Sequence, residues 1–454
     1  MNDQYLALLE QAKQYSVSYL DGVDQRPVYP TEEAIARLKA FEEPMPVTGT
    51  RPEQVLQMLQ EYGADATTEA LGGSYFGFVN GSILPVAHAA SWMASTWNQN
   101  CALYVMSPVS ARLEELCEKW LTELLHLPEG TAMGLVTGSS NAIICALAAA
   151  RDELLRRQGY SLARQGLRGA PPIRIVMGAE AHAAVRSALP LLGIGSEEVE
   201  EVPSDEQGRM RLDALPELDA HTLLILQAAN VTGGAYDPID ALCDRARAAG
   251  AWVHIDGAFG LWAAASRKQY PLIAGLEKAD SWSMDAHKTL NVGYDCGVVL
   301  CRDRQALVSA LQFNGSYLQR SEQERDGGCY TMDMSRRARA IPLWAALKAL
   351  GKEGVEQLVD TMCDQTAYFA EELEKAGFIL PQAAVFNQAA VKCATPEQTQ
   401  AVLEKVQHSG VCWCGAGKLN GEPVIRISVC SYRTRKEHID RSVKAFAEAL
   451  RSVR

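Results

Sequence analysis

The middle of the chain repeats one pattern: a short apolar segment is followed by a longer segment whose apolar residues have helical spacing. This alternation is typical of an α/β protein with a mainly parallel sheet covered by helices. In such sheets ligands bind beyond the carboxyl ends of the strands, so the residues just after each strand are candidate site residues. The expected strands are residues 134–137, 173–177, 222–227, 252–256, 281–284 and 297–301.

With 454 residues the chain is long enough for more than one structural unit. We expect an N-terminal helical segment at 1–65, a large domain containing the sheet at 66–313, and a mobile loop with a small C-terminal α/β domain at 314–454. Within the last unit the polar, glycine-containing stretch 321–334 is expected to be the mobile loop that closes over a bound substrate.

Composition excludes several other classes of protein. A net charge of −12 disfavours nucleic acid as a partner, because phosphate binding needs a basic surface. The apolar run 142–150 is far too short to span a bilayer, so no membrane is expected, and without a signal peptide the location is expected to be cytoplasmic. The twelve cysteines form no pair of CxxC motifs, so we expect free buried thiols and no metal site.

Three strand ends carry polar residues that together fit one cofactor. Ser139 and Ser140 follow the first strand and open a helix, which suits a phosphate, although such residues are also ordinary helix caps. Asp256 ends another strand, where it either has a functional role or caps a turn. Lys288 follows a third and is either a solvated surface lysine or an imine-forming nucleophile. A phosphate anchor, a carboxylate for the pyridinium nitrogen and a lysine for the aldehyde are what pyridoxal 5′-phosphate (PLP) requires.

A nicotinamide cofactor is disfavoured, because no G-x-G-x-x-G motif follows the first strand. The motifs DSWSMDAHKTLNVGYDCG, HIDGAFG, VTGSSNAIICALAAARD and GAEAHAAVRSAL resemble those of the group II PLP-dependent amino acid decarboxylases, which include glutamate, aromatic amino acid and histidine decarboxylases. The resemblance implies the aspartate-aminotransferase-like fold (fold type I) with a seven-stranded, mainly parallel sheet. It also implies an obligate homodimer with active sites at the interface, and we expect the N-terminal segment to pack on the partner subunit. The chain departs from the family pattern at Thr289, where an aromatic residue usually follows the lysine.

The resemblance also implies roles for individual residues. Lys288 would form the Schiff base, Asp256 would pair with the pyridinium nitrogen, and His182 would stack on the ring. Tyr330 would protonate the carbanion left after CO₂ leaves, unless it is a hinge aromatic that packs against the small domain. The other residues implied to contact the cofactor are Ser139, Ser140, Asn230, Ala258 and His287, of which His287 has simple packing as its alternative.

The substrate pocket is expected to include aromatic residues, which favour an aromatic or apolar amino acid unless these residues belong to the core. They are Tyr75, Phe76 and Tyr104. Arg426 lies in an apolar strand and so requires an anion, either a substrate carboxylate or a structural one. The expected reaction gives an amine and CO₂. The alternatives are oxidative decarboxylation to an aldehyde, transamination, and a non-catalytic binding protein that keeps the fold.

Overall fold

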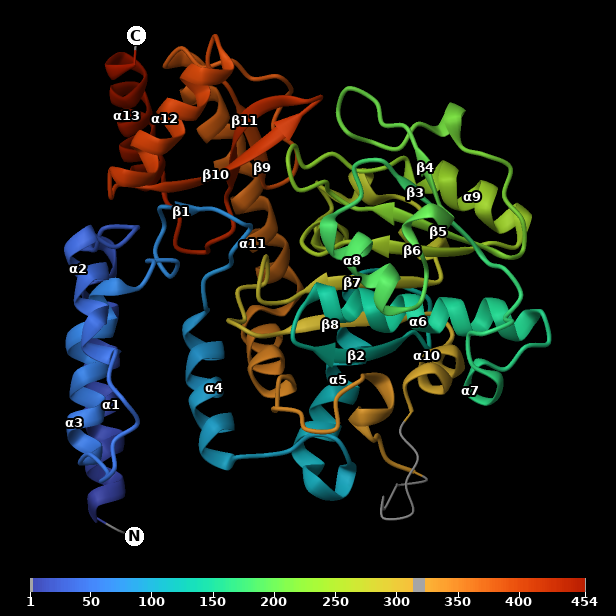
Figure 1. The fold of residues 1–454 in the computed structure, drawn as a ribbon, viewed down its shortest axis with the longest axis horizontal. Helices are drawn as coiled ribbons and strands as arrows, with labels where there is room; N and C mark the ends of the chain where they lie inside the picture. Colours follow the sequence, from blue (N-terminus) through green and yellow to red (C-terminus); the bar gives the residue numbers. More distant parts are fainter. Residues whose placement is uncertain (1–2, 313–322, 454) are drawn as a thin grey trace.

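The structure, a computed structural model, describes residues 3–312 and 323–453. Its main feature is a 7-stranded sheet with the strand order β2-β8-β7-β6-β5-β3-β4 (Figure 1). Strand β8 is antiparallel to both of its neighbours, β2 and β7, and all other pairs in this sheet are parallel, which confirms the predicted α/β fold with a mainly parallel sheet. The strands are β2 (Ala132–Val136), β3 (Arg174–Gly178), β4 (Val199–Val202), β5 (Thr222–Gln227), β6 (Trp252–Asp256), β7 (Ser281–Asp285) and β8 (Gly297–Cys301).

Helices cover both faces of this sheet, and the strand sequences reflect that. All six residues of β5, TLLILQ, are buried, as expected for a strand with no solvent-facing side. Helix α6 (Ser139–Arg157) crosses β6, β7 and β8 on one face, and its run of buried alanines allows close packing. The remaining helices of the large domain are α4 (Pro85–Trp97), α5 (Pro108–Leu124), α7 (Leu162–Gln165), α8 (Ala183–Leu191), α9 (Ile239–Ala249) and α10 (Arg304–Leu311).

A second sheet of 4 strands forms the core of the smaller domain, in the order β1-β10-β11-β9. Its strand β1 (Tyr75–Phe76) pairs with β10, so a segment that we expected in the large domain belongs to the smaller sheet. Helix α11 (Ala340–Lys375) connects the two domains and is interrupted at Gly351, whose φ is 61°. The other elements are β9 (Gln388–Val391), β10 (Trp413–Leu419), β11 (Glu422–Ser428), α12 (Pro396–His408) and α13 (Lys436–Ser452).

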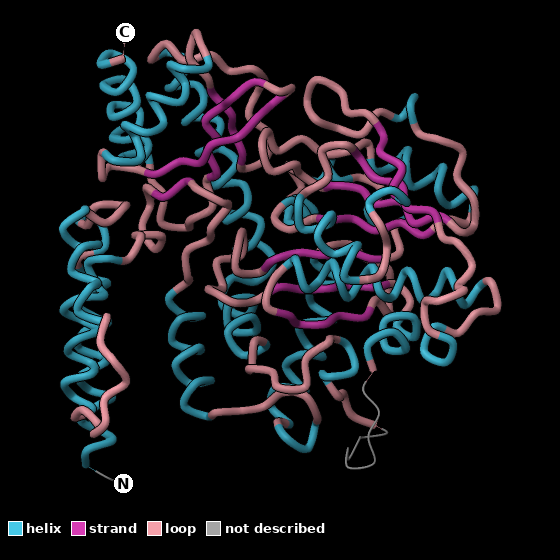
Figure 2. Tube along the Cα trace, in the orientation of Figure 1, coloured by secondary structure: helices cyan, strands magenta, loops and turns pink. Residues whose placement is uncertain are grey.

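The N-terminal helices α1 (Asp3–Asp21), α2 (Glu32–Arg37) and α3 (Pro52–Met58) form a separate group at one edge of the molecule (Figure 2). Helices α1 and α3 lie side by side, and α1 has no buried residue. The backbone joins this group to the small domain through a hydrogen bond from Val28 N–H to the carbonyl of Gly410. Across residues 3–312 and 323–453, no helix is both long enough and apolar enough to cross a bilayer.

Candidate functional site

The turn between β2 and α6 supplies backbone N–H groups at one end of the sheet. Gly138 is the N-cap and offers no side-chain cap, so the N–H groups at the start of the helix need an acceptor from another part of the protein or from an anion. The Ser139 N–H donates to Asp285 Oδ1 over 2.6 Å. A Cβ on Gly297 would lie 2.5 Å from Gly138 Cα, so this close approach of β8 to the turn requires glycine.

Lys288 lies just beyond β7, beside the same turn. Its Nζ is 3.1 Å from Asp285 Oδ2 and 6.0 Å from the centre of the Phe259 ring. His287 Nδ1 accepts the N–H of Cys296, and its Nε2 is 3.7 Å from Asp285 Oδ2. Burial lowers the pKa of His287, although the nearby Asp285 opposes that shift. The lysine, the neighbouring histidine and the first turn of α6 therefore meet around one carboxylate.

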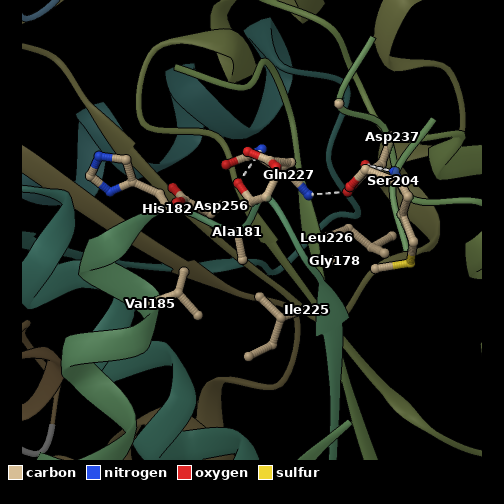
Figure 3. Close-up of a pocket in the computed structure, with 13 residues that line it drawn as sticks. Gly178, Ala181, His182, Val185, Ser204, Ile225, Leu226, Gln227, Asp237 and Asp256 are labelled. Atoms are coloured by element: carbon tan, nitrogen blue, oxygen red, sulfur yellow. Dashed lines mark hydrogen bonds between the residues drawn. The ribbon is translucent and has the colours of Figure 1, made fainter. Parts of the chain in front are cut away.

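Asp256 and His182 come from two further strand ends and lie at one end of a narrow pocket (Figure 3). Asp256 is 5% exposed, and burial raises its pKa, while the charges of His182 and Lys288 oppose that shift. His182 is the N-cap of α8, and its Nδ1 accepts the Ala184 N–H, so the proton of the neutral ring is on Nε2. Partial burial lowers the pKa of His182.

Arg426 approaches this group from β11 of the small domain. Its positive charge is one of the causes of the lowered pKa of His182. Burial lowers the pKa of Arg426 itself. Its Nε and Nη2 atoms are buried and have no hydrogen-bond partner among the residues that the structure describes. A guanidinium in this state has the donors to bind an anion between the two domains.

Some of the predicted site residues take up other contacts. Asn230 donates to the carbonyl of Gln207 and accepts the N–H of Gly233, so its amide holds a turn and does not point freely at a cofactor. Phe76 has no exposed surface and packs edge-on against Phe369, in the core of the small domain. Its expected place in the substrate pocket is therefore corrected to the alternative of a core aromatic.

Tyr330 also lies away from the lysine. Its hydroxyl accepts a hydrogen bond from Arg304 Nη1 at 2.8 Å, and its ring centre is 3.9 Å from Arg325 Cζ. Arg304 follows the carboxyl end of β8, whereas Asp285 pairs with Gly297 at the opposite end of that strand. The structure therefore does not bring Tyr330 to the Lys288 cluster of its own chain. Of the predicted loop 321–334, residues 321 and 322 lie outside the described residues.

The remaining predicted residues divide between the site and its surroundings. Ala258 N–H donates to Asp256 Oδ1, and Ser140 lies in the first turn of α6. The Tyr75 ring stacks on Trp413 at 5.4 Å, and burial raises its pKa to about 12. Tyr104 donates its backbone N–H to Asp326, and its hydroxyl makes no hydrogen bond to the Lys288 cluster among the described residues.

Comparison with known proteins agrees with this geometry. Residues 75–385 match the pyridoxal-dependent decarboxylase conserved domain, which covers more than half of the chain. The chain belongs to this family. It is therefore a PLP-dependent amino acid decarboxylase, a carbon–carbon lyase, as the motif resemblance predicted. The predicted cofactor is also confirmed, and solved relatives contain PLP.

Relatives of this decarboxylase differ in substrate. An aromatic-L-amino-acid decarboxylase from Bacillus atrophaeus is 24% identical over 96% of this chain and 94% of that protein. A cysteine sulfinic acid decarboxylase from Mus musculus is 30% identical over 64% of this chain and 61% of that protein. The crystal structure of Oryza sativa TDC with PLP and tryptamine superposes with a TM-score of 0.90 at 20% identity, covering 100% of this chain and 98% of that chain.

One residue of the cluster was missed by the sequence reasoning. Asp285 contacts Ser139, His287 and Lys288, yet we did not single it out in the sequence. The signal was present, because Asp285 ends a strand and lies three residues before the lysine. The residues around it fit PLP: they offer a helix N-terminus for a phosphate, a lysine for an aldehyde, and a buried carboxylate for a ring nitrogen.

Proposed function

We propose that this decarboxylase converts an L-amino acid with an aromatic or apolar side chain into its amine and CO₂. The observation that carries the proposal is the convergence of Lys288, Asp256 and His182 from three different strand ends onto one site. When bound, PLP supplies the electron sink that accepts the electron pair left by the departing CO₂. The stacked Tyr75, Trp413 and Phe78 rings support a non-polar side chain in the substrate.

Each residue of this chain has one task in the proposal. The first turn of α6, with Ser139, Ser140 and His287, holds the phosphate, and Ala258 orients Asp256. Asp256 keeps a proton on the ring nitrogen, because a buried carboxylate needs a cation beside it. Lys288 would hold the aldehyde carbon of the cofactor. His182 would lie against the ring, and its Nε2–H would donate to the substrate carboxylate.

Arg426 favours a second candidate, a substrate with an acidic side chain. Its Nε and Nη2, which have no partner among the described residues, could bind the carboxylate or sulfinate of the substrate side chain. The α-carboxylate, which leaves as CO₂, would then lie elsewhere in the site. The named relatives include decarboxylases of both substrate types. Tyr75 therefore favours an aromatic or apolar substrate, whereas Arg426 favours an acidic one. A panel of substrates distinguishes between these two classes.

The test is a panel of the twenty amino acids with cysteine sulfinate, scored for CO₂ and analysed for amine, aldehyde and keto acid. We expect amine from an aromatic or apolar substrate, and loss of that activity in Lys288→Ala. Borohydride reduction and peptide mapping should place the pyridoxyl group on Lys288. Aldehyde or keto acid as the main product would replace decarboxylation to the amine with one of the two alternative reactions. The absence of any turnover in a PLP-loaded protein would support a non-catalytic role.

We also propose that the protein is a homodimer. Large exposed apolar side chains are concentrated on α1 and α4, where a monomer would leave them in water. They are Tyr5, Leu6, Leu9 and Val17 on α1, and Val86, Trp92, Met93 and Trp97 on α4. A second copy of the chain would cover these faces.

A further inference from the structure

The carboxylate of Asp285 lies where a phosphate would be expected. Asp285 is the last residue of β7 and is 1% exposed. Its Oδ1 accepts the N–H of Ser139, the first residue of α6, over 2.6 Å. That N–H is among those that the proposed function gives to the phosphate of PLP. A protein side chain and the cofactor therefore compete for the same backbone donor.

The surrounding packing leaves little freedom to avoid this competition. A Cβ on Gly138 would lie 3.7 Å from Asp285 Oδ1, and one on Gly297 would meet the Gly138 backbone at 2.5 Å. The turn is therefore held between β7 and β8. A phosphate that accepts the Ser139 N–H would therefore displace Asp285 Oδ1 from it or lie against the carboxylate.

Charge makes the competition unfavourable to the cofactor. A phosphate dianion and a carboxylate a few ångströms apart repel each other in a site with little water. The other oxygen of Asp285 lies 3.1 Å from Lys288 Nζ, so the carboxylate also forms an ion pair with the lysine of the cofactor-free enzyme. His287 Nε2 lies 3.7 Å from the same oxygen, Oδ2 of Asp285.

We propose that Asp285 is an internal anion that occupies the phosphate subsite of the cofactor-free enzyme and thereby weakens its affinity for PLP. The inference rests on the proposed placement of the phosphate at α6. Binding of the cofactor displaces the carboxylate from Ser139 and leaves it near the lysine. The enzyme consequently exchanges its cofactor more readily than one with a neutral residue at this position.

The test compares the affinities of the cofactor-free protein for PLP and for pyridoxal, which lacks the phosphate. Asp285→Asn keeps an oxygen acceptor for the Ser139 N–H and removes the charge. We expect this variant to bind PLP at least about tenfold more tightly than the wild type, and its affinity for pyridoxal to change much less. Binding is measured by the absorbance of the lysine-bound form. Asp285→Ser, which is also neutral, should change each affinity in the same direction as Asp285→Asn does. It replaces the asparagine variant if that variant does not fold.

Asp280→Asn is the matched control. Asp280 immediately precedes β7, at its other end, and also accepts a backbone N–H, that of Val253 at 2.8 Å. The PLP affinity of this variant should equal that of the wild type. If Asp285→Asn strengthened the binding of PLP and of pyridoxal equally, the effect would come from Lys288, and the inference would be overturned. Unchanged or weaker binding of PLP would also overturn it. Failure of the wild type to attach PLP at Lys288 would instead refute the proposed function.

Discussion

Asp256 illustrates how burial prepares a single residue for its task. Burial raises its pKa, so the isolated protein disfavours the ionised form that the cofactor needs. The charges of His182 and Lys288 oppose this shift, and a protonated ring nitrogen would do so more strongly because it would contact the carboxylate directly. The ionised form of Asp256 and the protonated form of the ring therefore stabilise each other.

We expect Asp256→Asn to lower kcat by about 10²-fold or more, because a neutral amide cannot hold the proton on the ring nitrogen. The fold should remain, since Asn keeps the side-chain oxygen that accepts the Ala258 N–H. Steady-state rates at saturating PLP, together with thermal melting, provide the measurement. Near-normal turnover would mean that another group protonates the ring.

Tyr330→Phe should leave the ratio of amine to aldehyde unchanged. The hydroxyl is bound to Arg304 and the ring faces Arg325, so the side chain is part of the structural packing. Loss of that hydrogen bond should cost about 1 kcal/mol of folding free energy. Product analysis and urea unfolding test the two parts. Accumulation of aldehyde would return Tyr330 to the mechanism, acting in the site of a partner subunit.

Residues at strand ends were predictable because the pattern of apolar strands locates them. Ser139, Asp256 and Lys288 all lie where the sequence analysis expected. Asn230 and Phe76 were misplaced because their contacts come from Gln207 and Phe369, which are distant in the sequence. No local pattern shows which of several aromatic or amide side chains has been taken up by such a contact.

At the scale of elements, a buried ionic network attaches the segment after residue 322 to helix α5. Arg325 Nε lies 3.1 Å from Glu114, and its Nη1 lies 2.7 Å from Glu118. Arg336 also pairs with Glu114, at 3.0 Å. Within the predicted loop 321–334, the polar residue Arg325 is therefore buried against the large domain, where its charge alone had indicated solvent.

Arg325→Met should destabilise the protein by about 3 kcal/mol, because it leaves two carboxylates with less compensation in a buried site. Lys352→Met is the matched control, since its pair with Glu123 is exposed. We expect that change to stay within about 0.5 kcal/mol. Urea unfolding of both variants gives the comparison. Equal effects would mean that the buried network contributes no more than a surface pair.

Glu69 makes a turn sensitive to pH at the junction with the N-terminal helices. Burial raises its pKa from 4.5 to about 7, while hydrogen bonds from Gly72 and Leu71 lower it. The folded state thus holds the proton more tightly than the unfolded state, so this contribution to stability is largest below pH 4.5. It is lost as the pH rises toward 7. This raised pKa was not predictable from the sequence, because a single glutamate in a loop is ordinarily solvated.

Glu69→Gln should therefore raise the free energy of unfolding at pH 8 by about 2 kcal/mol and leave it unchanged at pH 4. One oxygen of Glu69 already accepts both N–H groups, at 3.0 and 2.9 Å, so glutamine can keep these hydrogen bonds. Denaturant titrations at several pH values measure the difference between the two proteins. A difference that does not vary with pH would contradict the assignment.

At the scale of the whole molecule, the proposed homodimer can be tested through its apolar faces. Leu9→Asp combined with Met93→Asp places charges on α1 and α4, where the side chains are 47% and 51% exposed. We expect the dimer to dissociate at concentrations at least about tenfold higher than the wild type. Leu191→Asp, at a side chain 72% exposed on α8, should have no effect. Light scattering after size exclusion distinguishes these outcomes.

The short strand β1 has a consequence for how the protein is made. It completes the sheet of the small domain, yet it is synthesised before the whole of the large domain, while its partner β10 emerges near the end. During translation β1 therefore stays unpaired until β10 has been synthesised, and the side chain of Phe76 stays unburied for the same time. The small domain is therefore not encoded by one contiguous stretch of chain. Any fragment that begins after β1 leaves the edge of β10 unpaired.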